Sequence, residues 1–187
     1  MSICKNLARW MLIGSRTEIL HKMKTHLNLY AALAVSIIPI VCNAQSDTAP
    51  VVDHRFINLE KGDLALSGYD PVSYFESSGP IQGSITNEVV YKGVRYRFAN
   101  ETNREAFESD PERFLPEFGG WCAWAMLEGE QVDVNPETYR IYDGKLLLYY
   151  DGLFGDTLKK WNKKATSTPE SELYQSAKNN WNKIIGR

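Results

Sequence analysis

The stretch "VYKGVRYRFANETNREAFESDPERFL", residues 90–115, decides the fold class of this 187-residue chain. Apolar and polar residues alternate on both sides of Lys92-Gly93. This alternation predicts a hairpin that turns at these two residues, with one strand ending at Tyr91 and the other covering 94–98. Helix-forming residues follow at once, so strands and helices are expected to be neighbours in one domain.

Short helices are predicted on both sides of this hairpin. Asn100 is a favourable N-cap residue, and Pro111 follows Asp110 at the first position of a second helix. Similar start patterns occur at Asp70-Pro71 and at Thr168-Pro169, where Asp70 and Thr168 are the expected N-caps. The predicted helices cover residues 70–77, 100–109, 110–115, 153–164 and 169–185.

A second hairpin is predicted from "NPETYRIYDGKLLLYYDG", residues 135–152, which turns at Asp143-Gly144. Because the strands are joined by hairpins and not by helical crossovers, they are expected to be antiparallel. The predicted fold is therefore α+β: a small antiparallel sheet built from two hairpins, with helices packed against it.

The N-terminal part has the pattern of a leader. Two lysines precede an apolar run at 27–41, and a Cys-Asn-Ala triplet ending at Ala44 follows it. This pattern predicts a signal peptide over 1–44, cut between Ala44 and Gln45, and a periplasmic or secreted protein. An uncleaved membrane anchor is the alternative, although the run is shorter than the roughly 18–20 residues that a spanning helix needs.

The leader suggests where the domain begins. Residues 1–22 lengthen the charged region before the apolar run, so we expect translation to start at Met23. Residues 45–61 contain Ser, Thr, Pro and several charges without a regular pattern, and are predicted to be a flexible tether. Residues 62–187 are predicted to form one domain.

Charge and cysteine usage exclude several classes of protein. Five of the 21 Lys and Arg residues and one of the 23 Asp and Glu residues precede Gln45, which leaves 16 positive and 22 negative charges in the expected mature chain. An acidic balance favours a soluble monomer or weak oligomer and disfavours a nucleic-acid partner. Of three cysteines, only Cys122 follows the leader, so an internal disulfide is excluded in the mature chain.

Three motifs together resemble the YHS domain family in its exported, stand-alone form. They are "GYDPVSYF" at 68–75, the long segment at 90–126, and "YDGKLLLYYDG" at 142–152. The resemblance implies a compact fold and an association with transition-metal handling. Metal-linked members carry cysteines at positions that correspond here to Ser73, Ala99 and approximately Asn103. The resemblance therefore does not imply a zinc-type thiolate site, which needs several such ligands.

The segment "EFGGWCAWAM" supplies the candidate metal site. If a helix starts near Trp121, Cys122 lies in its first turn, where the helix dipole favours the thiolate. Met126 follows four residues later and would share the same helical face. Thiolate and thioether are ligands suited to Cu(I), and His54 is a possible third ligand. The alternative is that Cys122 and Met126 only fill space in the core.

Three functions remain open after these observations. The leading expectation is a binding module of the cell envelope rather than an enzyme, with a metal ion, most plausibly Cu(I), or an envelope protein as its partner. The second is a thiol-based redox enzyme or sensor that uses Cys122. The third is a structural or interaction module. Its contact surface would be the second hairpin, which carries Tyr139, Tyr142, Tyr149 and Tyr150.

Other candidate residues have simpler explanations. Asp70 is accounted for by helix capping. After leader removal His54 is the only histidine, and it lies in the expected tether, which disfavours Ser-His and Cys-His catalysis in the domain. The lysines at 159, 160, 163 and 164 are expected to form a solvated helix face.

Overall fold

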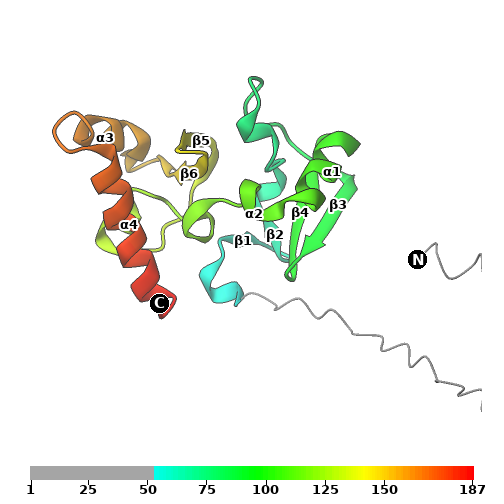
Figure 1. Cartoon of the computed structure of the whole chain (residues 1–187), viewed down its shortest axis with the longest axis horizontal. Helices are drawn as coiled ribbons and strands as arrows, with labels where there is room; N and C mark the ends of the chain where they lie inside the picture. Colours follow the sequence, from blue (N-terminus) through cyan, green and yellow to red (C-terminus); the bar gives the residue numbers. More distant parts are fainter. Residues whose placement is uncertain (1–52) are drawn as a thin grey trace, which may run out of the picture. The chain divides into compact units, whose positions relative to one another are not determined.

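The structure, a computed structural model, describes residues 53–187, which lie within one compact unit of the chain, Ser46–Arg187. The predicted leader, the cleavage site and the Met23 start lie outside the described residues. Figure 1 shows the arrangement of the helices and strands. The helices are α1 (Glu101–Ser109), α2 (Pro111–Phe114), α3 (Thr157–Lys164) and α4 (Glu170–Ile184). The strands are β1 (Leu59–Glu60), β2 (Leu64–Ala65), β3 (Ser84–Tyr91), β4 (Val94–Phe98), β5 (Asn135–Tyr142), β6 (Lys145–Tyr149), β7 (Asp151–Gly152) and β8 (Gly155–Asp156). Short 3-10 helices cover His54–Phe56, Leu66–Gly68, Ser73–Phe75, Glu117–Gly120 and Ala125–Glu128.

The first predicted hairpin is confirmed. Strands β3 and β4 pair in antiparallel register with Tyr91 opposite Val94, and both turn residues, Lys92 and Gly93, have positive φ. Positive φ at both positions is the requirement of the tight turns that match strand twist. The helix after the hairpin is also confirmed, because the Asn100 side chain accepts a hydrogen bond from the Asn103 N–H.

The α+β class is confirmed, and the two hairpins lie in separate sheets. Strands β1, β2, β4 and β3 form one sheet in that order, and β2 pairs with β4 in parallel. Strands β5 and β6 form a second sheet, which turns at Asp143-Gly144 as predicted. Residues 84–98 and 135–149 therefore do not join into the single sheet that the sequence suggested.

Strand β6 connects two hydrophobic cores by burying both of its faces. Leu146 and Leu148 pack into the first core, with the aromatic side chains of β4 and α1. Leu147 and Tyr149 point the other way, into a second core formed with α3 and α4 around Trp161. Successive side chains of a strand alternate between its faces, so the uninterrupted apolar run of β6 fits a strand covered on both sides.

Some predicted helix boundaries are wrong. Helix α3 begins at Thr157 instead of residue 153, because the preceding residues form the small β7–β8 hairpin and Asp156 caps the helix. Helix α4 begins at Glu170 with Pro169 at the N-cap, and the expected N-cap Thr168 does not cap it. Within the predicted helix over 70–77, only a 3-10 turn at Ser73–Phe75 forms.

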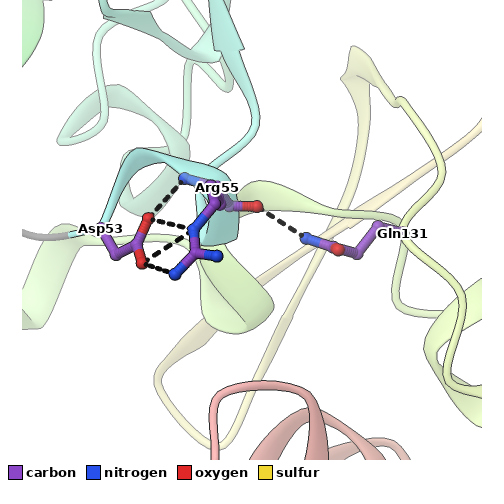
Figure 2. A network of polar contacts seen from close by, with 3 residues as sticks. All are labelled: Asp53, Arg55 and Gln131. Atoms are coloured by element: carbon purple, nitrogen blue, oxygen red, sulfur yellow. Dashed lines mark hydrogen bonds and ion pairs between the residues drawn. The ribbon is translucent and has the colours of Figure 1, made fainter.

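The expected tether over 45–61 belongs to the domain in its described part. Leu59 and Glu60 form β1, which pairs with β2. Figure 2 shows the start of the described part of this segment. Asp53 pairs with Arg55, and the Gln131 side chain donates to the Arg55 carbonyl at 3.3 Å. The apolar side chains at 57 and 59 pack against the first core, which explains why this segment is ordered.

Between residues 53 and 187, no helix is both long and apolar enough to cross a lipid bilayer.

Candidate functional site

A cleft of about 300 Å³ lies where three distant parts of the sequence meet. Residues 57–67 form one wall, residues 115–120 a second, and residues 133–136 a third, and Tyr96 of β4 and Leu148 of β6 complete the lining. Its volume is at the lower end of the range for small-molecule sites. We take this cleft as the candidate functional site.

The lining of the cleft combines an apolar surface with a few polar groups. This composition is typical of ligand-binding sites, in which apolar contacts give affinity and a small number of polar groups give orientation. The apolar contacts come from Ala65, Leu66, Tyr96, Leu115, Val134 and Leu148, and the polar side chains from Asn58, Glu60, Ser67 and Asp133.

Two of the polar side chains are held in place by hydrogen bonds. The Ser67 hydroxyl donates to the Glu60 carboxylate at 3.1 Å. The Asn58 side chain donates to the Gly120 carbonyl at 3.3 Å, and the Asn58 backbone N–H donates to the Gly119 carbonyl at 2.8 Å. The wall formed by residues 57–67 is thereby fixed to the wall formed by residues 115–120.

The only charged residues that line the cleft are acidic. Glu60 and Asp133 are both exposed, and among residues 53–187 no Lys, Arg or His lines the cleft. Tyr96 supplies a neutral phenol, because burial raises its pKa and the Glu112 carboxylate and Tyr91 add to that rise. The exposed part of the cleft lining is therefore negatively charged, while its buried apolar residues and the Tyr96 phenol carry no charge.

The backbone of the cleft is strained at two adjacent non-glycine residues. Leu66 and Ser67 have φ of 57° and 50°, in the left-handed region. This conformation costs an L-residue about 1–2 kcal/mol. The turn is kept in place because the Leu66 carbonyl accepts from the Tyr69 N–H at 2.9 Å and the Ser67 carbonyl from the Gln82 side chain at 3.1 Å. Strain that the surrounding structure maintains is concentrated at functional sites in proteins.

The sequence analysis missed the cleft, although one local pattern indicates part of it. Ile57 and Leu59 alternate with Asn58 and Glu60 before Lys61-Gly62, and the apolar run Leu64–Leu66 follows it after Asp63. Such alternation around a Gly-containing turn is a hairpin pattern, and β1 and β2 form that hairpin. The other two walls come from distant segments, and no local pattern relates them to the first.

The prediction that Cys122 lies in the first turn of a helix is wrong. Trp121 has extended backbone angles, and Cys122 forms a parallel β-bridge with Leu148. A single helical turn follows, in which the Cys122 carbonyl accepts from the Met126 N–H at 3.0 Å. The bridge to β6 sets the backbone of Cys122, so the dipole argument for a stabilised thiolate does not apply.

The Cys122 side chain is fully buried. Its exposed fraction is 0%, as is that of Met126, which packs into the second core. The Cys122 sulfur lies 3.4 Å from the Thr157 hydroxyl oxygen and accepts a hydrogen bond of 3.4 Å from the Tyr150 N–H. These contacts support the interpretation that the two sulfurs fill space in the core.

The predicted Cu(I) site lacks a ligand set around these sulfurs. Among residues 53–187, no group of three His, Cys, Asp or Glu side chains is placed to hold a metal ion. His54 instead faces Asp63, with its Nδ1 atom 3.1 Å from the carboxylate. Cu(I) binding by Cys122 and Met126 stays a prediction, and the burial of both side chains counts against it.

Asp70 caps the following turn as predicted, and it also connects three elements. One carboxyl oxygen accepts from the Val72 N–H at 2.8 Å and from the Ser73 N–H at 3.4 Å. The other accepts from the Ala99 N–H at 2.9 Å, next to the end of β4, and from the Asn103 side chain in α1 at 2.7 Å. Asp70 is fully buried. Its role is therefore structural.

The four tyrosines proposed as a contact surface are divided between separate packing sites. Tyr139 packs edge-on against Tyr74, Tyr142 lies beside Tyr174, and Tyr150 stacks on Phe154. Tyr149 is fully buried in the second core against Trp161. The second hairpin therefore does not present them as one aromatic face.

No model of a known protein family, no curated protein and no solved structure matches this chain. The resemblance to the YHS domain family rests on the three motifs and stays a prediction.

Proposed function

We propose that this protein is a binding module of the YHS type that is exported to the cell envelope and holds a small organic ligand in the cleft. The ligand is neutral or positively charged. The observation that carries the proposal is the cleft itself: about 300 Å³ of space with a partly apolar lining, in which Glu60 and Asp133 are the only charged lining residues within 53–187.

The charge of the lining supports this choice of ligand. A negatively charged ligand would be repelled by Glu60 and Asp133 and would find no lysine, arginine or histidine in the lining to neutralise it. A cationic group of the ligand would be attracted to both carboxylates, while its apolar part contacts apolar lining residues such as Leu66, Val134 and Leu148.

The polar groups of the cleft support binding more than catalysis. Nucleophilic catalysis needs an activated side chain, most often with histidine or lysine close by. The cleft lining includes no Cys, His or Lys, and its one hydroxyl outside the tyrosine, that of Ser67, donates to Glu60. The hydrogen bond from Ser67 therefore positions the Glu60 carboxylate as an acceptor for a ligand.

A thermal-shift experiment tests the proposal with sets of small molecules that share a shape and differ in charge. We expect neutral and cationic members to raise the melting temperature and anionic members to have no effect. Glu60→Gln combined with Asp133→Asn should remove the preference for cations. The control, Glu105→Gln combined with Glu172→Gln, removes the same charge from exposed positions outside the cleft lining and should keep the preference.

A second variant tests the site itself. Val134→Phe places a larger side chain in the cleft and should abolish the thermal shift of every ligand. The proposal is wrong if no ligand stabilises the protein, if only anionic ligands do, or if Val134→Phe binds them as well as the parent does.

A further inference from the structure

The most exposed large apolar side chains of residues 53–187 lie together at the tip of the β7–β8 hairpin. Leu153 is 98% exposed and Phe154 is 83% exposed. They occupy the turn between Gly152 and Gly155, which are paired across the hairpin. Isolated apolar residues on a surface are normal, but two adjacent ones at a projecting turn suggest a contact with another surface.

The tip is held outward by specific contacts. The Phe154 N–H donates to the Tyr150 hydroxyl at 3.3 Å, and the Phe154 ring stacks on the Tyr150 ring with centroids 6.4 Å apart. A Cβ atom on Gly152 would lie 2.5 Å from that hydroxyl oxygen, so glycine permits the close approach of Tyr150. These contacts keep Leu153 and Phe154 exposed instead of letting them fold back onto the domain.

Positive charge is gathered beside the tip. Lys160 donates from its ammonium group to the Phe154 carbonyl at 3.4 Å. Lys159, Lys163 and Lys164 lie on the same helix, α3, and all four lysines are exposed. Residues three and four apart are neighbours on a helix surface, so the four form one continuous basic surface.

This basic surface contrasts with the rest of the chain, which is acidic beyond the leader. Asp156 offsets part of it by pairing with Lys159. Within residues 53–187, Lys160, Lys163 and Lys164 form no ion pair. Lys160 therefore lies at the tip without an ion-pair partner in this part of the chain, and Lys163 and Lys164 continue the positive charge along α3.

We propose that the Leu153-Phe154 tip and the lysines of α3 form a docking site for an anionic lipid bilayer. In this arrangement the two apolar side chains enter the interfacial layer, while Tyr150 and the lysines remain at the headgroups. Aromatic and basic residues are enriched at that depth, where the rings are partly wet and the ammonium groups contact lipid phosphates.

A lipid surface fits better than a protein partner. A stable protein interface covers about 800 Å² on each side, with a buried apolar centre and a polar rim. Two apolar side chains on a narrow hairpin give only a small centre, and the four lysines of α3 outnumber the two carboxylates of the hairpin, Asp151 and Asp156. Weak attachment to a bilayer needs no more than a small apolar insertion and a few basic residues.

Vesicle co-sedimentation tests this proposal. The protein is the chain from Gln45 onward, the form expected after cleavage, because both hydrophobic cores and all paired strands lie within Ser46–Arg187. Circular dichroism verifies that each variant is folded. The probes are vesicles of phosphatidylcholine mixed with phosphatidylglycerol and vesicles of phosphatidylcholine alone.

We expect binding to the anionic vesicles that weakens as salt is added. Leu153→Ser combined with Phe154→Ser should reduce the partition coefficient about tenfold or more, because burial of each apolar side chain drives insertion. Lys163→Gln combined with Lys164→Gln should reduce it severalfold and lower the preference for anionic lipid. The control, Ile85→Ser combined with Val90→Ser, removes two exposed apolar residues of β3 and should bind like the parent.

The proposal is overturned if the parent protein does not sediment with anionic vesicles. It is also overturned if the Leu153 and Phe154 variant binds as well as the parent, or if the parent binds both kinds of vesicle equally. If the tip binds a protein partner instead, the parent protein should not sediment with anionic vesicles.

Discussion

Asp70 and Cys122 are both fully buried, yet they are held in very different ways. Asp70 accepts four hydrogen bonds, from its own turn, from the end of β4 and from α1. The Cys122 sulfur has two polar contacts, both at 3.4 Å. One is with the N–H of Tyr150, directly after β6, and the other is with the hydroxyl of Thr157, the first residue of α3. Asp70 therefore connects separate elements, whereas the Cys122 side chain fills a space between elements that other contacts already hold in place.

This difference indicates whether the stability of the fold depends more on the Asp-Pro turn or on the cysteine. A buried donor that loses its acceptor costs free energy of desolvation that nothing replaces. A buried thiol contributes mainly apolar contacts, which neighbouring side chains can replace in part. The Asp-Pro turn, which sequence analysis treated as a simple cap, should therefore matter more for stability than the cysteine, on which the functional hypotheses were based.

The largest expected effect is that of Asp70→Ala. It removes the acceptors of three backbone N–H groups and of the Asn103 side chain. We expect the free energy of unfolding to fall by about 3 kcal/mol or more, because several buried donors lose their partners together. Urea denaturation followed by tryptophan fluorescence measures this loss.

Asp70→Asn sharpens the same test, since it keeps the shape but replaces one acceptor oxygen with an NH₂ group. It should also destabilise the protein, because that group would face N–H donors on either side. A loss below about 1 kcal/mol in both variants, the range of a single ordinary hydrogen bond, would contradict the connecting role of Asp70.

Gly119→Ala should have the next largest effect. Gly119 has φ of +63°, and a Cβ atom there would lie 2.1 Å from the Phe56 carbonyl oxygen. We expect a loss of about 2 kcal/mol in stability, from backbone strain and from displacement of the segment that carries Asn58. Because Asn58 fixes one wall of the cleft, the ligand-induced thermal shift should also decrease.

Gly144→Ala is the matched control for this variant. Its φ is +68°, but no atom lies within 4 Å of the added methyl group. It therefore reports the backbone strain alone, about 1 kcal/mol. Equal losses in the two variants would show that the close approach of residues 56–58 to Gly119 does not contribute to stability.

The parts of the fold that sequence analysis predicted correctly are those that depend on neighbouring residues. Lys92-Gly93 and Asp143-Gly144 form turns that a few residues specify, and Asn100 caps the helix that follows it. What the sequence did not predict depends on distant contacts. The two hairpins lie in separate sheets, and the edge of β6 that does not pair with β5 is bridged by Pro116 and Cys122 instead of by a strand of the first hairpin.

The candidate site follows the same rule. The cleft joins residues 57–67, 115–120 and 133–136, and no local pattern indicates that these three segments meet. The helix predicted at Trp121 does not form because Cys122 pairs with Leu148 in β6. Helix propensity is a weak preference, and a tertiary contact of this kind overrides it.

Cys122→Ala should have the smallest effect, and it separates the packing role of the thiol from a metal or redox role. We expect a loss of about 1 kcal/mol in stability, the typical cost of removing one buried heavy atom. In the native protein the thiol should react with iodoacetamide only when the domain opens, because the side chain is 0% exposed. In a titration of the reduced protein against a competing chelator, Cys122→Ala and Met126→Leu should both bind Cu(I) as weakly as the parent. If the parent holds Cu(I) tightly and both variants lose it, the sulfurs must become accessible together, and the predicted copper site would replace the interpretation that they only fill the core.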